Sequence, residues 1–166
     1  MKRHNNLYQQ ICSIENINLA DSIARKGKMN QPGIIAHDKN CESDITALRE
    51  SLLNKTYITS EYTTFPIYEP KERLIFRLPY YPDRIVHHAV MNVLEPVFTA
   101  TFTADTYSCI KGRGIHAAAR SLKGALKDKE NTRHCLKLDV KKFYPNVDHE
   151  ILKQLLRKKI KDKDLL

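Results

Sequence analysis

One aspartate near the end of the chain stands among residue types that handle nucleotides. In LKLDVKKFYPNVDHEIL, residues 136–152, Asp139 follows a short apolar run and precedes two lysines and two aromatic residues. A carboxylate at the C-terminal end of a buried strand sits on rigid backbone at the rim of a sheet. There it can ligate Mg²⁺, while neighbouring cations hold phosphates and an aromatic ring packs on a sugar. The run therefore predicts a strand over 134–140 that ends in a candidate catalytic residue.

The same residues also have simpler interpretations. Asp139 could form a salt bridge with Lys141 or Lys142, because many acids of this kind are structural. Phe143 and Tyr144 could be ordinary core residues, which is the commoner fate of phenylalanine. A site for two metal ions also needs further carboxylates, and no Asp-Asp pair occurs in the 166 residues.

The composition favours a polyanionic partner. The 166 residues are enough for one ordinary domain, and 28 Lys and Arg against 19 Asp and Glu give a net charge of +9. This balance favours nucleic acid first and an anionic membrane surface second. No apolar run approaches the roughly 18 residues of a membrane span, and the N-terminus, MKRHNNLYQQICS, lacks the apolar centre of a secretory signal. We expect a cytoplasmic protein without a membrane partner.

The cysteines give no sign of a metal site or a disulfide framework. They stand at positions 12, 41, 109 and 135, and no two of them form a C-x-x-C pair. Reduced thiols are the simplest interpretation. His134 beside Cys135 is better explained as part of a strand than as a zinc ligand, because no second pair of ligands has metal-site spacing.

Helical spacing dominates the first third of the chain. Apolar residues recur at this spacing at Leu7, Ile11, Ile14 and Ile17. Gly and Pro in residues 27–33 break the pattern. A second helix is expected over Cys41–Leu53, whose apolar residues lie on one face.

Residues 57–79 have the chemistry of strands. They are rich in β-branched and aromatic residues, and RLIFRL alternates in polarity. Glu69–Glu72 has the composition of a turn, so we expect a hairpin. Pro66 would then lie on an edge strand or at a bulge.

Helices are expected again in the second half of the chain. Asp83 is a suitable N-cap for a helix that Pro96 ends, and a further helix is expected over residues 116–127. Asp148 would cap a last helix, whose apolar face is Ile151, Leu152, Leu155, Leu156 and Ile160.

Three blocks of sequence resemble the reverse transcriptases of bacterial retroelements, either diversity-generating or group II intron-like. The first catalytic motif of that family, an apolar strand followed by D-[IV]-x-x-[FC]-[FY], corresponds to LKLDVKKFYPNVDHEIL. The fingers segment corresponds to EPKERLIFRLPYYPDRIVHHAVMNVLEPVF, and a further block corresponds to DTYSCIKGRGIHAAARSL. The resemblance covers roughly residues 57–166, and several motifs in one order are more specific than any one alone.

The resemblance implies roles around the aspartate. Asp139 would ligate both catalytic Mg²⁺ ions, with the carbonyl of Val140 completing the shell of one ion. The N–H groups of Lys142 and Phe143 would contact the triphosphate. Tyr144 would be the aromatic gate that excludes a ribose 2′-hydroxyl and so selects deoxynucleotides.

The resemblance also implies roles for cations of the fingers. Lys71 and Arg73 would bind the incoming triphosphate, and strand alternation is consistent with this because Lys71, Arg73 and Arg77 can share a face. The candidate nucleic-acid-binding residues are Arg77, Arg84, His87, His88 and Arg113. The alternatives are a solvated hairpin edge, ordinary surface positions on a helix, and a plain turn at KGRG.

The expected fold class is α+β. Residues 1–56 would be a helical N-terminal segment, residues 57–130 the fingers region with its β-hairpin, and residues 131–166 the first strand and helix of a polymerase palm. Such a palm sheet is incomplete, and its open edge favours self-association.

The implied function is RNA-directed DNA synthesis with two Mg²⁺ ions, an RNA template, a DNA primer and dNTP. The family's second acidic motif, Tyr-x-Asp-Asp, is absent from the 166 residues, so we expect an N-terminal fragment that is inactive alone. One alternative is a non-catalytic basic module that binds nucleic acid. Another is a structural domain whose positive charge is incidental.

Overall fold

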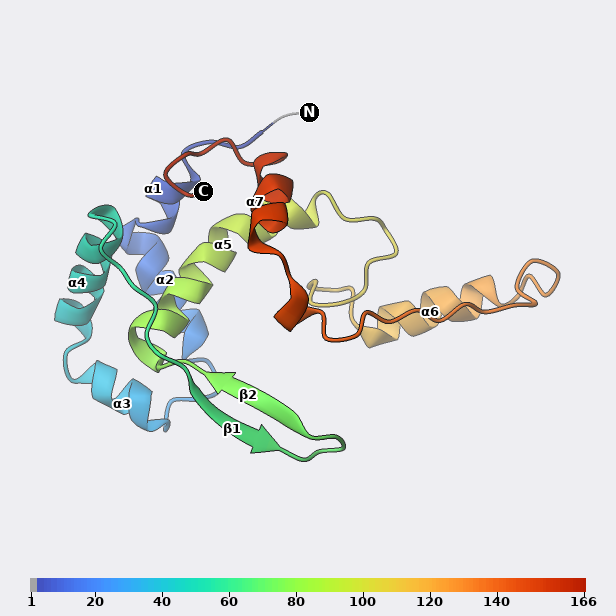
Figure 1. The fold of residues 1–166 in the computed structure, drawn as a ribbon, viewed down its shortest axis with the longest axis horizontal. Helices are drawn as coiled ribbons and strands as arrows, with labels where there is room; N and C mark the ends of the chain where they lie inside the picture. The colour runs from blue at the N-terminus through green and yellow to red at the C-terminus, as the bar shows by residue number, and fades with distance from the viewer. Residues whose placement is uncertain (1–2) are drawn as a thin grey trace.

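Helices from the first hundred residues form the body of the molecule in the computed structural model, which describes residues 3–166 (Figure 1). They are α1 (Leu7–Ile11), α2 (Ile14–Ala24), α3 (Pro32–Asp38), α4 (Cys41–Leu53) and α5 (Ile85–Thr99). Helix α2 packs on both α4 and α5, and α1 packs on α5. The helix expected over Cys41–Leu53 is confirmed residue for residue.

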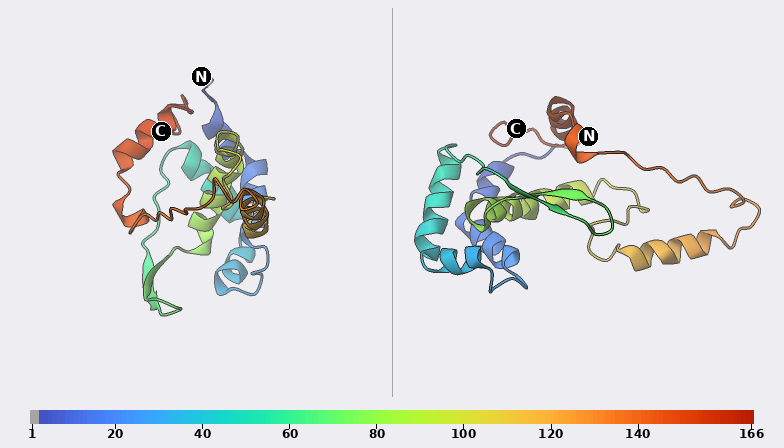
Figure 2. Two further views of the ribbon diagram at one scale, coloured as in Figure 1. Left: turned by 90° about the vertical axis from the view of Figure 1, so that its right-hand side faces the viewer. Right: turned by 60° about the horizontal axis from the view of Figure 1, so that its bottom comes forward.

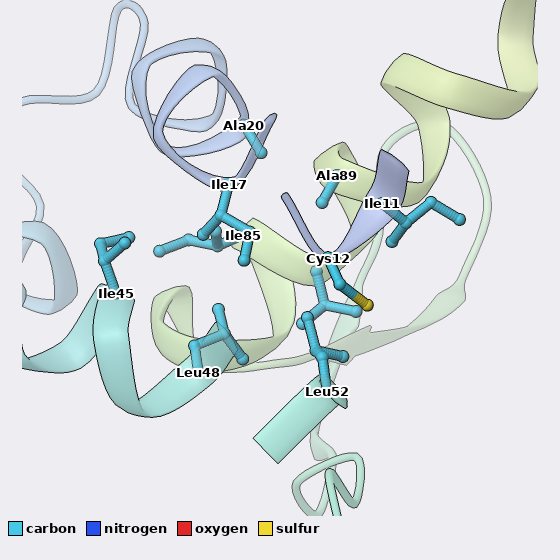
Figure 3. Packing of buried hydrophobic residues seen from close by; sticks show 10 residues of the cluster. Ile11, Cys12, Ile17, Ala20, Ile45, Leu48, Leu52, Ile85 and Ala89 are labelled. Carbon is cyan, nitrogen blue, oxygen red and sulfur yellow. The ribbon is translucent and has the colours of Figure 1, made fainter. Parts of the chain in front are cut away.

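The core lies where α1, α2, α4 and α5 meet (Figure 3). Ile17 and Ile85 are fully buried there, and Ile45 and Leu48 of α4 close over them. Ala20 and Ala89 are also fully buried, and small side chains of this kind let helix backbones approach closely. Burial of these apolar faces is the main stabilising contribution to this part of the fold.

The first expected helix is divided in two. Its apolar spacing continues from α1 into α2, but the chain breaks at Cys12 and Ser13, where the Ser13 hydroxyl accepts from the N–H of Asn16 and caps α2. The side-chain amide of Asn16 donates to the carbonyl of Ala89 at 3.0 Å and to that of Ile11 at 3.1 Å. A polar side chain thus satisfies a backbone group on α1 and one on α5 at the break.

The expected hairpin is confirmed. Strands β1 (Thr63–Ile67) and β2 (Arg73–Arg77) pair antiparallel with Phe65 opposite Ile75, and they form a two-stranded sheet. Both strands are therefore edges. This is why Pro66, which has no N–H to donate, is tolerated within β1. The hairpin projects from the helical body in Figure 1.

Asp83 has a different role from the expected helix cap. A π-helical turn over Tyr80–Arg84 runs directly into α5, so Asp83 does not stand at the start of a helix. Its carboxylate is fully buried, and Oδ1 accepts from the Tyr57 hydroxyl at 2.6 Å and from the Ser60 N–H at 3.1 Å. Asp83 therefore links the segment that enters β1 to the segment that leaves β2.

Pro96 does not end the helix that follows the hairpin, and the expectation of a helix end there is wrong. Helix α5 includes Pro96 and continues to Thr99. A proline in a helix removes one backbone hydrogen bond, and the remaining bonds of the last turn can still form. The N–H of Ala100 donates to the Pro96 carbonyl at 3.3 Å.

Helix α6 (Ile115–Ala125) and the extended chain that follows it reach away from the body as an arm (Figures 1 and 2). The chain then comes back toward the body at a 3₁₀ turn (Tyr144–Asn146) and α7 (His149–Arg157). Neither α6 nor α7 has a buried residue. Asp148 caps α7 as expected, because its carboxylate accepts from the N–H groups of Glu150 and Ile151.

The strand expected over 134–140 is extended but not paired. In the part of the chain that the structure describes, β1 and β2 form the only sheet. Leu136 and Leu138 are 82% and 81% exposed. A strand needs a neighbouring backbone for its hydrogen bonds, and this segment has none.

The end of the chain returns to its beginning. His4 and Ile160 form a parallel bridge, and Asp162 accepts from the N–H of Tyr8 at 2.9 Å. Ile160 is buried there and lies outside α7, so its expected place on the helix face is wrong. Burial acts to raise the pKa of Asp162, but backbone N–H groups that include that of Tyr8 outweigh it and hold the pKa below its usual range.

The α+β class is confirmed, with helices and one small antiparallel sheet. The division at residues 56 and 130 stays a prediction. Among the described residues, no helix is both long and apolar enough to cross a membrane.

Replacing Asp83 tests its role at the base of the hairpin. Burial acts to raise its pKa, but hydrogen bonds from Tyr57 and Ser60 outweigh it and lower the pKa. A lowered folded-state pKa adds stability that is present above the unfolded value and is lost as the pH falls through the folded one. We expect Asp83→Ala to cost about 2–4 kcal/mol at neutral pH.

The Asp83→Asn variant should show a smaller loss of stability than wild type as the pH falls below about 4. Thermal unfolding measured by circular dichroism as a function of pH gives the stability of each variant at neutral pH. It also gives the loss of stability at acid pH, which is the acid limb of the curve. The exposed carboxylate of Glu61, as Glu61→Gln, is the control and should leave the acid limb unchanged. An acid limb identical in Asp83→Asn and wild type would contradict the role assigned to Asp83.

Candidate nucleic-acid interface

A groove of about 610 Å³ lies between the hairpin and the helices α2 and α3. Side chains that alternate along β1 and β2 form one wall of the groove. Ile75 and Arg77 share a face of β2, and Phe65 stands opposite Ile75 on β1, so the three side chains line one side. The opposite side comes from the end of α2 and the start of α3, where Lys28 and Gln31 line the groove.

Cations and aromatic rings together line this groove. Lys28, Arg77 and Arg84 supply positive charge, and all three side chains are exposed. Tyr80 and Tyr81 add aromatic rings where the chain leaves β2. Cations that follow a phosphate backbone, together with rings on which bases stack, are the usual elements of single-stranded nucleic-acid sites.

The electrostatic effect of these cations is visible at His88. This residue is half-buried on α5, and burial lowers the pKa of its imidazole. The charges of Arg84 and Lys28, followed by that of His87, lower it further. The positive potential of the groove therefore extends to the first turns of α5, where an anion would be attracted.

A buried polar network supports the tyrosines of the groove. The Tyr80 hydroxyl donates to the Asp21 carboxylate, and Arg25 donates to Asp21 at 2.6 Å. The His37 ring stacks on Tyr81 with centroids 5.3 Å apart. These contacts join α2 and α3 to the residues that leave β2, so the helical body fixes the position of the groove's aromatic rings.

The structure brings some of the expected cations together. Arg73 and Arg77 stand at the two ends of β2 on one face, as the alternation indicated. Lys71 lies in the turn before β2, outside the strand. Arg84 and His87 are exposed at the end of the π-helical turn and on α5.

Arg113 lies in the loop before α6, and its guanidinium makes an internal contact. It donates to the carbonyl of Thr103 at 3.2 Å, and its N–H donates to Ile110 to close a turn. Gly112 has φ 79, a value that favours glycine. The plain turn that was the alternative for KGRG is therefore formed.

The residues around Asp139 form a separate, exposed group. Val140 is 69% exposed and Tyr144 is 88% exposed, and the rings of Phe143 and Tyr144 meet edge to face at 5.4 Å. The side-chain amide of Asn146 donates to the Lys142 carbonyl and closes a local turn. Within residues 3–166, no hydrogen bond or ion pair joins this group to the hairpin.

The donors at Asp139 do not by themselves fit a site for two Mg²⁺ ions. Mg²⁺ prefers several oxygen ligands in octahedral geometry. Among the described residues, Asp139 belongs to no group of three or more carboxylate, histidine or cysteine side chains that could share an ion. Any such site therefore needs carboxylates beyond this one.

Sequence reasoning missed Lys28 and the buried network beneath Tyr80. Lys28 falls in the Gly- and Pro-containing break, where its distance from the hairpin cannot be read from spacing. One signal was available for the network: His37 and Cys41 are separated by three residues. Neither residue stands in a recognisable metal motif, so their spacing alone is a weak indication of the network.

Comparison with known proteins gives distant relatives. No family model matches the chain. It is 26% identical over 149 residues to the protein YkfC of Escherichia coli K12, a match that covers 85% of this chain and 39% of YkfC. It is 28% identical over 88 residues to the mitochondrial protein nuclear intron maturase 1 of Arabidopsis thaliana, covering 53% of this chain and 12% of the maturase.

The match to the maturase supports a coarse relationship to maturases and reverse-transcriptase-related proteins, and the name of YkfC adds nothing to it. The identity is low in both matches, and the chain spans 39% and 12% of the length of the two relatives.

Removing one cation from the groove should raise the pKa of His88. Lys28→Met removes one of the positive charges that disfavour the protonated form of His88. Protonation of His88 therefore becomes more favourable. An NMR titration of the imidazole C–H resonances measures the change. An unchanged pKa of His88 would contradict the electrostatic link between Lys28 and α5.

Proposed function

We propose that the chain is the fingers and first palm elements of a reverse-transcriptase-related protein, and that it binds an RNA template in the groove beside the hairpin. The single observation that carries the binding proposal is the groove's set of cations, Lys28, Arg77 and Arg84, beside aromatic side chains. The match to an intron maturase supports the family part of the proposal. The net charge of +9 is consistent with a polyanionic partner.

In this proposal the phosphates lie along the cations, and bases stack on the aromatic rings that line the groove. Arg77 and Arg84 line the groove from the hairpin side, and Lys28 lines it from the loop between α2 and α3. An RNA strand between them would have cations on both sides. Contacts to its phosphates would orient the RNA without distinguishing its base sequence. Arg73, at the far end of β2, continues the line of cations toward Lys71, where the incoming triphosphate of a dNTP would bind.

Asp139 is proposed as one of the metal-binding carboxylates of a complete polymerase. Mg²⁺ bound there would lower the barrier to phosphoryl transfer by neutralising charge on the reacting oxygens. This chain contributes a single carboxylate to that chemistry, with Lys142, Phe143 and Tyr144 beside it. The remaining carboxylates would have to come from further polypeptide, so the 166 residues alone are proposed to be inactive in DNA synthesis.

The second candidate function is a non-catalytic module that binds nucleic acid. The exposed position of Asp139, apart from the hairpin cations, favours it. Both candidates use the same groove, and they differ in whether the Asp139 carboxylate has a role. Substitution of that residue therefore distinguishes them.

RNA binding should depend on salt and on the groove cations. We expect the affinity for a single-stranded RNA oligonucleotide to fall linearly on a log–log plot against salt. Arg77→Ala and Arg84→Ala should each weaken binding and reduce the slope by about 1. Fluorescence anisotropy over a salt series measures both quantities.

Lys163→Ala is the charge-matched control, because Lys163 lies in the C-terminal segment outside the groove. Its salt slope should equal that of wild type. Equal slopes for the groove variants and wild type would refute template binding in the groove.

Primer extension on an RNA template tests the polymerase proposal. The 166-residue chain should incorporate no dNTP. In a longer polypeptide that carries a Tyr-x-Asp-Asp motif, Asp139→Ala should abolish synthesis and leave RNA binding unchanged. Synthesis by the chain alone would refute its proposed inactivity. An active Asp139→Ala enzyme would refute the role of this carboxylate and leave the non-catalytic module.

A further inference from the structure

We propose that Asp21, His37 and Cys41 form a binding site for one Zn²⁺ ion, which joins helices α2, α3 and α4. The site lies in the helical body beside the proposed template groove, whose lining includes His37, and metal binding there does not require a bound template. An oxygen of Asp21, a ring nitrogen of His37 and the sulfur of Cys41 all lie within 4.8 Å of one another. Among the described residues, no other group of three such side chains has this proximity.

The histidine gives the strongest indication of a ligand. The side chain of His37 is completely buried, and its Nδ1 lies 2.7 Å from Oδ2 of Asp44. Its Nε2 has no hydrogen-bond partner among the described residues. A buried imidazole nitrogen without a partner is unfavourable, and a metal ion would satisfy it.

The contact with Asp44 also suits a metal ligand. A histidine that binds zinc through one nitrogen usually donates its other N–H to a carboxylate, which fixes the tautomer and the ring orientation. Asp44 stands in that position, and in the tautomer that donates from Nδ1 to Asp44 the Nε2 atom carries a lone pair. The nitrogen points toward Asp21, whose Oδ1 lies 3.6 Å away.

The distances fit zinc coordination. Ligand atoms around a tetrahedral Zn²⁺ lie roughly 3.2–3.8 Å apart, given Zn–N and Zn–O distances near 2.0 Å and Zn–S near 2.3 Å. The pair formed by Asp21 and His37 is already in this range. Cys41 needs a movement of about 1 Å at most, and water can occupy the fourth position.

The charges around the site favour a cation. Asp21, Asp38 and Asp44 are balanced within this cluster by one guanidinium, that of Arg25, which lies 2.6 Å from both Asp21 and Asp38. Carboxylates therefore outnumber cations. Cys41 is the first residue of α4, and burial, together with the charge of Asp21, raises the pKa of its thiol, so a bound metal ion would have to displace the thiol proton. A mixed nitrogen, sulfur and oxygen set is typical of Zn²⁺ and disfavours Mg²⁺ or Ca²⁺.

An imidazolium is the competing explanation. A doubly protonated His37 could donate to Asp44 and interact with Asp21 across 3.6 Å, which would also neutralise the cluster. That arrangement does not use the sulfur of Cys41. The thiol therefore separates the two explanations.

Zinc content and thermal unfolding of the full 166-residue chain test the site. We expect the protein to retain one zinc per chain after dialysis, and zinc returned to a chelator-treated sample should raise Tm by several degrees. Cys41→Ser should lose both the bound zinc and the rise in Tm. Cys109→Ser, which removes an exposed thiol, should behave as wild type.

Cobalt substitution of the wild-type chain gives a readout that does not depend on the folding of a variant. Bound Co²⁺ should show a thiolate-to-cobalt charge-transfer band in the near ultraviolet, and one equivalent of Zn²⁺ should remove it. Absence of bound metal, or zinc binding that Cys41→Ser leaves intact, would overturn the proposal. In that case the imidazolium explains the cluster.

Discussion

The buried carboxylate of Asp83 holds both ends of the hairpin segment against the helical body. It accepts from Tyr57 and Ser60 on the chain entering β1, and it lies in the π-helical turn that connects β2 to α5. A two-stranded hairpin has little stability of its own in water. Its position relative to the helices therefore depends on this contact and on the tyrosines that follow β2. The groove beside the hairpin exists because these residues fix one of its walls.

The helices and the hairpin could be predicted because their signals are local. Apolar spacing placed Cys41–Leu53 without error, and alternation with a turn placed β1 and β2. The role of Asp83 could not be predicted in this way. Its sequence neighbourhood suggests a helix cap, and only the approach of Tyr57, 26 residues earlier, shows that it is a buried link between segments.

The expectation for residues 134–140 fails for a related reason. Alternation between apolar and polar residues describes a strand that has a partner, and sequence alone does not show whether one is present. Leu136 and Leu138 remain exposed because no strand lies beside them in the described residues. The same holds for α7, whose apolar residues Ile151 and Leu155 are 57% and 51% exposed. Local pattern thus identifies which surfaces are apolar, while tertiary contacts decide whether they are buried.

The residues of the candidate site show the same difference between what local sequence could and could not predict. The resemblance could identify Arg77 and Arg84, which do line the groove, because their order along the chain is local information. Lys28 lies in the loop between α2 and α3, and the cluster around His37 belongs to helices that precede the hairpin. The approach of both to Tyr80 and Tyr81 is a tertiary property. One consequence is that packing within the helical body also sets the geometry of the groove. Any change that loosens the contact between Asp21 and Tyr80 should alter the groove, even though Asp21 does not line it.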